Sequence, residues 1–179
     1  IGIEIDGCYY HSELSGGKDK KYHLDKTNNC LKKNIKLIHI WEDDWVYNNN
    51  IIKSMILNKL GKSLKIYARK CEIKEIIDNK IIRNFLEDNH IQGFVGSKIK
   101  LGLYNNNELV SLMTFGNLRK VLNTKSKEGS YELIRFCNKL NTTIIGGSSR
   151  LLKYFINFYL CGSASAFDCP GARPRVIID

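Results

Sequence analysis

The stretch IGIEIDGCYYHSE, residues 1–13, sets two acidic side chains and a histidine around a glycine turn at the end of an apolar segment. Its β-formers predict a strand over residues 1–5, and Gly7 predicts the turn that follows. Side chains two residues apart on a strand leave the same face, so Glu4 and Asp6 are expected to converge. His11 lies past the turn and is close enough in sequence to fold back over them.

This pattern fits two kinds of structure. Carboxylate oxygens hold Mg²⁺ or Mn²⁺, which lowers the pKa of a bound water, and a nearby imidazole can transfer a proton. Glu4 and Asp6 are therefore candidate metal ligands, and Glu4, Asp6 and His11 are candidate catalytic residues. The alternative is an exposed strand edge that carries a surface histidine, and the spacing alone favours this alternative.

Outward from this stretch, the sequence predicts a strand–helix–strand–helix unit over residues 1–61. YHLDKTNNCLKKN (22–34) has a helical apolar face in Leu24, Thr27 and Leu31, and IKLIHIWEDDW (35–45) reads as a buried strand. The helix of residues 48–60 has an Asn cap and ends at Gly61. Alternating strands and helices indicate an α/β fold. Within the second strand and its end, the residues expected to be structural are His39, Trp41 and Trp45 in the core and Glu42, Asp43 and Asp44 at the cap of the next helix.

A second unit is predicted over residues 62–160, with mixed α/β (α+β) character. LKIYARKCEIKEI (64–76) alternates as a strand, Asp78 caps a helix, and residues 99–117 form two strands joined by an Asn-rich hairpin. YELIRFCNKL (131–140) is a further strand, and Gly146 and Gly147 form a turn before an amphipathic helix. Residues 161–179 contain both prolines and three of the four alanines of the chain. We assign no fold to this tail, which has the composition of a linker, a frameshift or a foreign junction.

Composition narrows the class of protein. The content of 43% hydrophobic residues suits a folded protein, and no apolar run approaches membrane-spanning length, which predicts a cytoplasmic protein without membrane contact. The six cysteines are widely spaced and are expected to be reduced thiols. The net charge of +10 favours a polyanionic partner, most simply nucleic acid, although a lysine-rich surface gives the same charge. Residues 62–160 hold 17 Lys and Arg against 8 Asp and Glu, so the excess lies there.

The first unit resembles a known family of nucleases. IEIDGCYYHSE, the helix with Tyr22, His23 and Lys26, and IKLIHIWEDDW together resemble the core of the very-short-patch-repair (Vsr) nucleases and the related EDxHD homing endonucleases, of the PD-(D/E)XK superfamily. The resemblance implies a restriction-endonuclease-like core with Glu4 at the acidic position of the (D/E)XK strand, Asp6 at the lysine position and His11 at the last His of the Vsr turn. It also implies a further metal-binding Asp upstream of this chain, so the chain is expected to be a fragment.

The second unit resembles the front part of a GNAT (N-acetyltransferase-like) fold. Gly146, Gly147, Ser148 and Arg150 stand where that fold binds the pyrophosphate of acetyl-CoA with backbone N–H groups at a helix N-terminus. An ordinary tight turn before a helix fits these residues as well.

These observations give a first hypothesis and an alternative. The first is an Mg²⁺- or Mn²⁺-dependent endonuclease of phage or homing type that acts on double-stranded DNA. The alternative is a GNAT-type acyltransferase that uses acetyl-CoA, or a DNA-binding module without catalysis. The residues expected to contact DNA are Lys26, Lys98, Lys100, Arg119 and Lys120.

Overall fold

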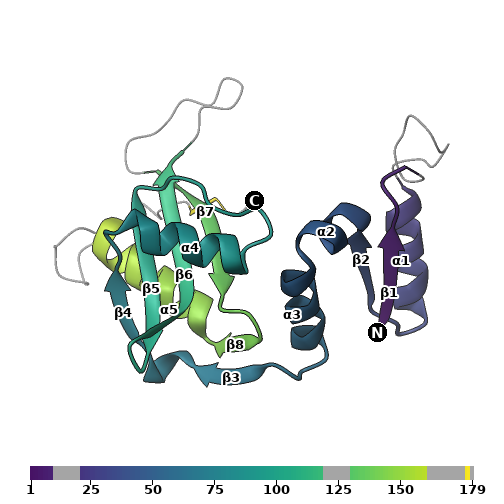
Figure 1. Cartoon of the computed structure of the whole chain (residues 1–179), viewed down its shortest axis with the longest axis horizontal. Helices are drawn as coiled ribbons and strands as arrows, with labels where there is room; N and C mark the ends of the chain where they lie inside the picture. Colours follow the sequence, from purple (N-terminus) through teal and green to yellow (C-terminus); the bar gives the residue numbers. More distant parts are fainter. Residues whose placement is uncertain (10–20, 119–129, 161–175, 178–179) are drawn as a thin grey trace, which may run out of the picture. The chain divides into compact units, whose positions relative to one another are not determined.

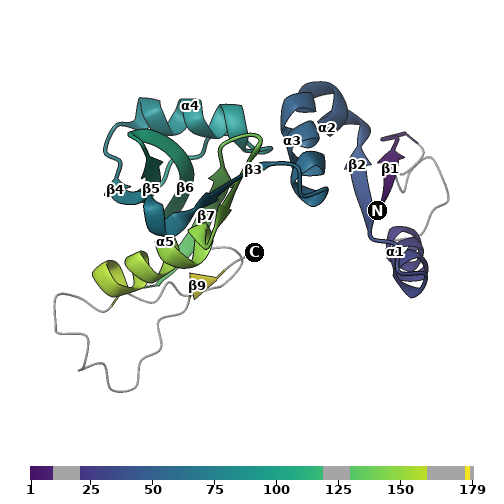
Figure 2. The same ribbon diagram turned by 90° about the horizontal axis from the view of Figure 1, so that it is seen from below.

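The computed structural model describes residues 1–9, 21–118, 130–160 and 176–177. Helices and strands in mixed sheets give an α/β (α+β) fold, which confirms the predicted class (Figures 1 and 2). Contacts divide the chain into two compact units, Ile1–Lys53 and Ser54–Asp179. The division falls within helix α3 (Asn49–Lys59), and the boundary expected from the sequence, at residues 61 and 62, lies just after that helix.

The first unit is built on a β–α–β arrangement. Strands β1 (Gly2–Asp6) and β2 (Leu37–Trp41) pair in parallel, and helix α1 (Tyr22–Lys32) lies between them in the chain, as parallel pairing requires. Asn34, at a φ of 57°, follows the end of α1 and turns the chain into β2. Helix α2 (Glu42–Tyr47) and α3 come next. In the strand register, Glu4 lies opposite His39.

Strand β1 buries its acids and exposes its isoleucines, the reverse of the usual pattern. Asp6 is fully buried and Glu4 is half-buried, whereas Ile3 and Ile5 are exposed. Helix α1 is also inverted. The prediction that Leu24 and Leu31 form its buried face is wrong, because both are exposed and the half-buried positions are mostly polar. A polar cluster therefore lies between β1, β2 and α1.

The second unit has three layers. Its main sheet has the order β4-β5-β6-β7-β9, and Figure 2 shows helices α4 and α5 on opposite faces of it. One apolar core contains Leu151 and Phe155 of α5, and the other contains Ile82 and Leu86 of α4. A separate two-stranded parallel sheet pairs β3 with β8. The elements of this unit are β3 (Leu64–Tyr67), a 3-10 turn η1 (Ala68–Lys70), β4 (Glu72–Glu75), α4 (Asn79–Asn89), β5 (Ile99–Asn105), β6 (Glu108–Asn117), β7 (Tyr131–Asn138), β8 (Thr142–Ile145), α5 (Gly147–Phe155), a π-helical turn η2 (Ile156–Leu160) and β9 (Val176–Ile177).

Several local predictions in this unit are confirmed. Asp78 caps α4 by accepting a hydrogen bond from the Lys80 N–H, and Asn106 and Asn107 form the β5–β6 hairpin turn at positive φ. The single strand predicted over residues 64–76 is wrong, because η1 splits it into β3 and β4 of different sheets. The tail, to which we assigned no fold, contributes β9, which pairs in parallel with β7. Among the described residues, no helix is long and apolar enough to cross a membrane.

Candidate functional site

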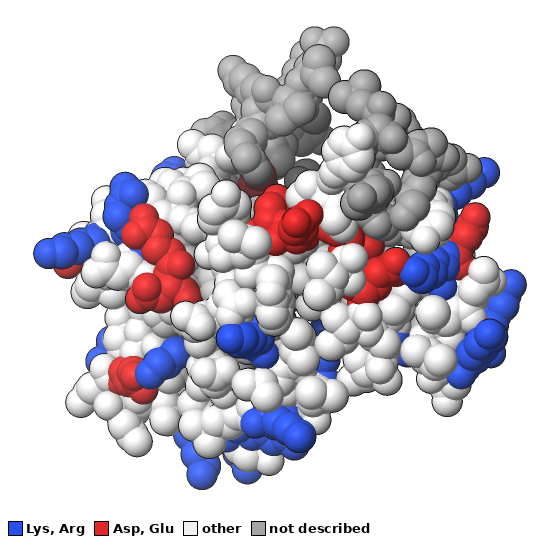
Figure 3. Space-filling view, turned by 45° about the vertical axis from the view of Figure 1, so that its right-hand side comes forward, with Lys and Arg blue, Asp and Glu red and all other residues white. Residues whose placement is uncertain are grey.

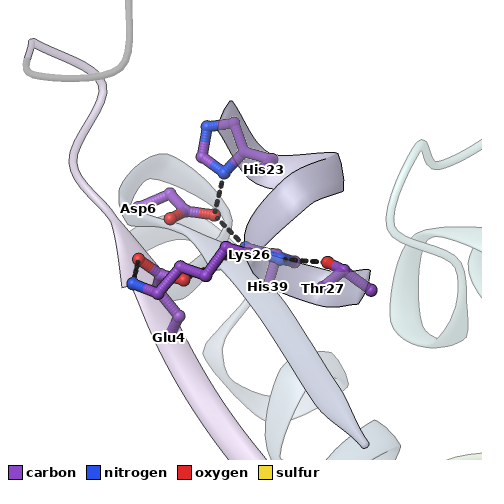
Figure 4. A network of polar contacts seen from close by, with 6 residues as sticks. All are labelled: Glu4, Asp6, His23, Lys26, Thr27 and His39. Atoms are coloured by element: carbon purple, nitrogen blue, oxygen red, sulfur yellow. Dashed lines mark hydrogen bonds and ion pairs between the residues drawn. The ribbon is translucent and has the colours of Figure 1, made fainter. Parts of the chain in front are cut away.

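A polar cluster lies between the β1–β2 sheet and α1 (Figure 4). Strand β1 supplies Glu4 and Asp6, and β2 supplies His39, the residue opposite Glu4 in the register. Helix α1 supplies the others, which are spaced three or four residues apart and so share one helix face. The cluster consists of Glu4, Asp6, His23, Lys26, Thr27 and His39.

Hydrogen bonds join the centre of the cluster. His39 Nδ1 lies 2.9 Å from Asp6 Oδ2, and His39 Nε2 lies 3.0 Å from Thr27 Oγ1. His23 Nδ1 is 3.8 Å from the same Asp6 oxygen, and the His23 and His39 rings meet edge to face. Asp6 is fully buried, whereas the side chains of His23 and His39 are 29% and 22% exposed. The carboxylate is therefore at the floor of the cluster and the imidazoles are at its open side.

Glu4 and Lys26 form an ion pair beside this centre. Lys26 Nζ donates a hydrogen bond to Glu4 Oε1, while Glu4 Oε2 lies 3.6 Å from His39 Nδ1. Burial would raise the pKa of Glu4, but the Lys26 hydrogen bond and the positive charge of the ammonium outweigh it and hold that pKa below its usual value. The Glu4 carboxylate in turn raises the pKa of Lys26. Glu4 is thus ionised and Lys26 is charged at neutral pH.

One carboxylate and two imidazoles are placed so that they can hold a metal ion. One ligand atom from each of Asp6, His23 and His39 lies within 4.8 Å of the others. Oxygen from a carboxylate and nitrogen from imidazole are common ligands of catalytic metal ions in proteins. The residues present therefore fit a metal centre with three protein ligands.

The sequence predicted part of this site. Glu4 and Asp6 do share a face of β1, as their spacing indicates, but Glu4 is held by Lys26 and the group that can bind a metal is completed by two histidines. His11 lies outside the described residues. His39, predicted to be a core histidine with satisfied hydrogen bonds, has a partner at each ring nitrogen, but its side chain is 22% exposed and one partner is Asp6. The position of His39 beside the acids of β1 could have been predicted, because parallel pairing of β1 and β2 places His39 opposite Glu4.

Lys26 and the aromatic residues near the site were also predicted from the sequence. Lys26, predicted to face DNA phosphates, pairs with Glu4 and is 42% exposed, so its contact with DNA stays a prediction. Trp41, predicted in the core, is 40% exposed, and its ring lies 5.7 Å from that of His23. Glu42, Asp43 and Asp44, predicted to cap the next helix, lie in the first turn of α2, but the N-cap is Trp41 and no described side chain caps the helix by a hydrogen bond.

A groove runs along α1 next to this cluster. It has a volume of about 350 Å³ and shares Lys26 with the cluster, and Lys33 lies farther along the helix. The full set of residues that line it is Tyr22, Asp25, Lys26, Asn29, Cys30 and Lys33. Two ammonium groups, an amide and an aromatic ring are suited to contacts with a nucleic-acid strand.

The second unit has a cavity of about 400 Å³ at the ends of β3 and β8. These strands are parallel, so their carboxyl ends meet at one edge, where ligands bind in many parallel sheets. Gly146, at a φ of 76°, precedes α5, and Gly147 is its first residue. The Arg69 guanidinium lies 5.2 Å from the Tyr67 ring, and Arg150 donates a hydrogen bond to the Ala68 carbonyl. The residues that line the cavity are Tyr67, Ala68, Arg69, Ile145, Gly146 and Arg150, so of the three predicted cofactor-binding residues only Gly146 lines it.

The residues expected to contact DNA in the second unit are partly described. Lys98 is exposed, and its Nζ lies 5.9 Å from the centre of the Tyr131 ring, while Lys100 on β5 is half-buried. Arg119 and Lys120 lie outside the described residues. Figure 3 shows basic side chains in several separate groups on the face in view, with acidic side chains among them.

Comparisons of this chain with protein-family models, curated proteins and solved structures give no match. The resemblances to Vsr-type nucleases and to the GNAT fold stay predictions from the sequence.

Proposed function

We propose that the Ile1–Lys53 unit hydrolyses phosphodiester bonds of double-stranded DNA with the help of a divalent metal ion. The observation that carries this proposal is the convergence of Asp6, His23 and His39 beside the Glu4–Lys26 pair. A metal ion held by these ligands would supply Lewis-acid activation of the phosphoryl group and of an attacking water.

The remaining residues of the cluster have roles that suit this reaction. Glu4 Oε2 is buried, and no group among the described residues donates a hydrogen bond to it, so in this proposal the ionised oxygen accepts one from a water held inside the site and orients it. The Lys26 ammonium can contact a phosphate oxygen next to it. The groove along α1 continues from Lys26 to Lys33 and offers a path for the adjoining strand.

The test is cleavage of a supercoiled plasmid by the full chain with a panel of divalent ions. We expect cleavage that a chelator stops, and Asp6→Asn should slow it by more than about 10- to 100-fold, the cost of changing a residue that only supports a metal ligand. The matched control is Asp43→Asn, which changes an exposed acid in the same unit and should cleave as the wild type does. Cleavage by Asp6→Asn at the wild-type rate would contradict the proposal.

DNA binding by the second unit is part of this proposal and is supported by its excess of basic residues. The affinity of the chain for a duplex should fall steeply as salt rises, because each neutralised phosphate releases counterions. Lys98→Ala should reduce the slope of log affinity against log salt by about 1. An unchanged slope would exclude Lys98 from the interface.

A second candidate function is favoured by the cavity in the Ser54–Asp179 unit. Two guanidinium groups and an aromatic ring line it, and none of the described residues that line it is acidic, which suits a phosphorylated ligand such as acetyl-CoA. Acetyl-CoA should raise the thermal midpoint of the chain, since a ligand that binds only the folded state stabilises it. Arg69→Gln should weaken this shift, and Arg83→Gln on α4 is the matched control. No shift at any acetyl-CoA concentration would remove this candidate.

A further inference from the structure

We infer that the cluster of Asp6, His23 and His39 selects a first-row transition-metal ion of the Zn²⁺ type over Mg²⁺. The inference deepens the proposed function, because it names the chemical class of the metal ion at the same site. It also differs from the expectation drawn from the sequence, in which Glu4 and Asp6 hold Mg²⁺ or Mn²⁺.

The ligand atoms of the cluster favour metal ions that bind imidazole. Mg²⁺ prefers an octahedral shell of oxygen atoms and retains several waters, whereas imidazole nitrogen suits Zn²⁺, Co²⁺ and related ions. Two of the three ligand atoms that converge here are imidazole nitrogens. The other nearby carboxylate, Glu4, can offer at most its Oε2, because Oε1 is bonded to Lys26, and the cluster would then still supply as many imidazoles as carboxylates.

The distances between the ligand atoms are close to those of a tetrahedral ion. A tetrahedral ion with ligands at about 2.0–2.1 Å holds neighbouring ligand atoms about 3.3 Å apart. The separations of Asp6 Oδ2 from His39 Nδ1 and His23 Nδ1, 2.9 Å and 3.8 Å, lie on either side of that value. All three ligand atoms lie within 4.8 Å of one another.

Thr27 is placed to orient the His39 ring. Imidazole ligands of metal ions commonly donate their other N–H to a fixed acceptor, which orients the ring. His39 Nε2 lies 3.0 Å from Thr27 Oγ1, so a His39 that binds metal through Nδ1 can donate its Nε2–H to that hydroxyl. Thr27 is therefore a positioning residue for the metal ligand.

The number of protein ligands indicates the type of centre. Asp6 and the His23 Nδ1 atom are buried, the His23 and His39 side chains are 29% and 22% exposed, and three protein ligands converge among the described residues. Three protein ligands with one open position are characteristic of catalytic zinc sites, while structural zinc sites are closed by four. The ligands come from β1, α1 and β2, so the site requires the folded unit.

The experiment is a metal titration of the chelator-treated full chain, with tryptophan fluorescence and the visible absorption of Co²⁺ as readouts. Both tryptophans, Trp41 and Trp45, lie in this unit, and the Trp41 ring is 5.7 Å from His23, so bound paramagnetic Co²⁺ should quench the emission. We expect one Co²⁺ per chain with tetrahedral absorption, displaced by equimolar Zn²⁺ and retained in a large excess of Mg²⁺. Displacement by Mg²⁺ as effective as by Zn²⁺ would overturn the inference.

Variants assign the ligands. His23→Ala and His39→Ala should abolish stoichiometric Co²⁺ binding, and His90→Ala in the other unit is the matched histidine control. Thr27→Val should weaken Zn²⁺ binding about 10- to 100-fold, whereas Thr27→Ser should retain it. Since the histidine variants can fail to fold, the two Thr27 variants and the Co²⁺ absorption of the wild type test the metal site independently of them. Equal affinity of Thr27→Val and Thr27→Ser would overturn the role of Thr27.

Two results separate this inference from the proposed function. A chain that binds Zn²⁺ through these residues but cleaves no DNA keeps the metal site and loses the nuclease assignment. A chain that cleaves DNA with Mg²⁺ and is unaffected by His23→Ala keeps the nuclease assignment and loses the imidazole-ligated centre.

Discussion

Replacement of Asp6 by Asn tests the internal energetics of the cluster without any metal. The Asp6 side chain is fully buried, and its Oδ2 is 2.9 Å from His39 Nδ1, which donates to it. Asn has the same shape and can still accept that hydrogen bond, but it removes the negative charge.

The magnitude follows from the difference between the two bonds. A hydrogen bond to a charged group contributes about 1.5–3 kcal/mol and a neutral one about 1 kcal/mol. Removal of the Asp6 charge would also relieve repulsion from Glu4, but Lys26 already pairs with that carboxylate, so the relief is small. We expect Asp6→Asn to lower the free energy of unfolding of the Ile1–Lys53 unit by about 0.5–2 kcal/mol.

The assay is urea unfolding in a chelating buffer, followed by tryptophan fluorescence. The two tryptophans of the chain both lie in this unit, so their emission reports its unfolding. Asp43→Asn, an exposed change in the same unit, should stay within about 0.5 kcal/mol of the wild type. If Asp6→Asn is as stable as the wild type or more stable, His39 does not stabilise the buried carboxylate. The charges of the cluster would then destabilise the unit, as is common at functional sites.

Three further predictions concern the Ser54–Asp179 unit, measured by circular dichroism. Phe155→Ala should cost about 3–5 kcal/mol of stability, and the exposed Phe158→Ala should cost little. Asn107 has a φ of 63°, so Asn107→Ala should lower the free energy of unfolding by about 1–2 kcal/mol, and Asn107→Gly should leave it unchanged. Burial, and then the charge of Arg135, lower the pKa of His90, so the unfolded chain takes up that proton first. Stability should fall as the pH drops from 6.5 toward the folded pKa, and His90→Asn should flatten this loss. Unchanged midpoints in Phe155→Ala, equal stability of the two Asn107 variants, or the same pH slope in His90→Asn would contradict the respective prediction.

The order of helices and strands was predictable because local signals agreed with the fold. Asp78 caps a helix, two Asn residues at positive φ make a hairpin, and Gly61 follows the end of α3, each for a reason that lies within a few residues. The break between β3 and β4 had a local signal that we missed. Leu64, Ile66 and Ala68 alternate in one phase and Cys71 and Ile73 in the other, and pairing with β8 and β5 places the two segments in different sheets.

The site shows where local reasoning stops. The alternation of side chains on β1 was enough to place Glu4 and Asp6 on one face. For α1, however, we expected the leucine face to be buried, and the sheet contacts its polar side instead. The apolar face of a helix turns inward because burial of hydrocarbon is favourable, and a half-buried polar face requires compensation from specific partners. Here Asp6 with His39, Thr27 with His39, and Lys26 with Glu4 provide it. A helix that leaves Leu24 and Leu31 exposed while it directs His23 toward a buried carboxylate contradicts its own hydrophobic pattern, and such conflicts are expected at functional sites. The inversion of α1 and of β1 is thus an argument for function that is independent of any family resemblance.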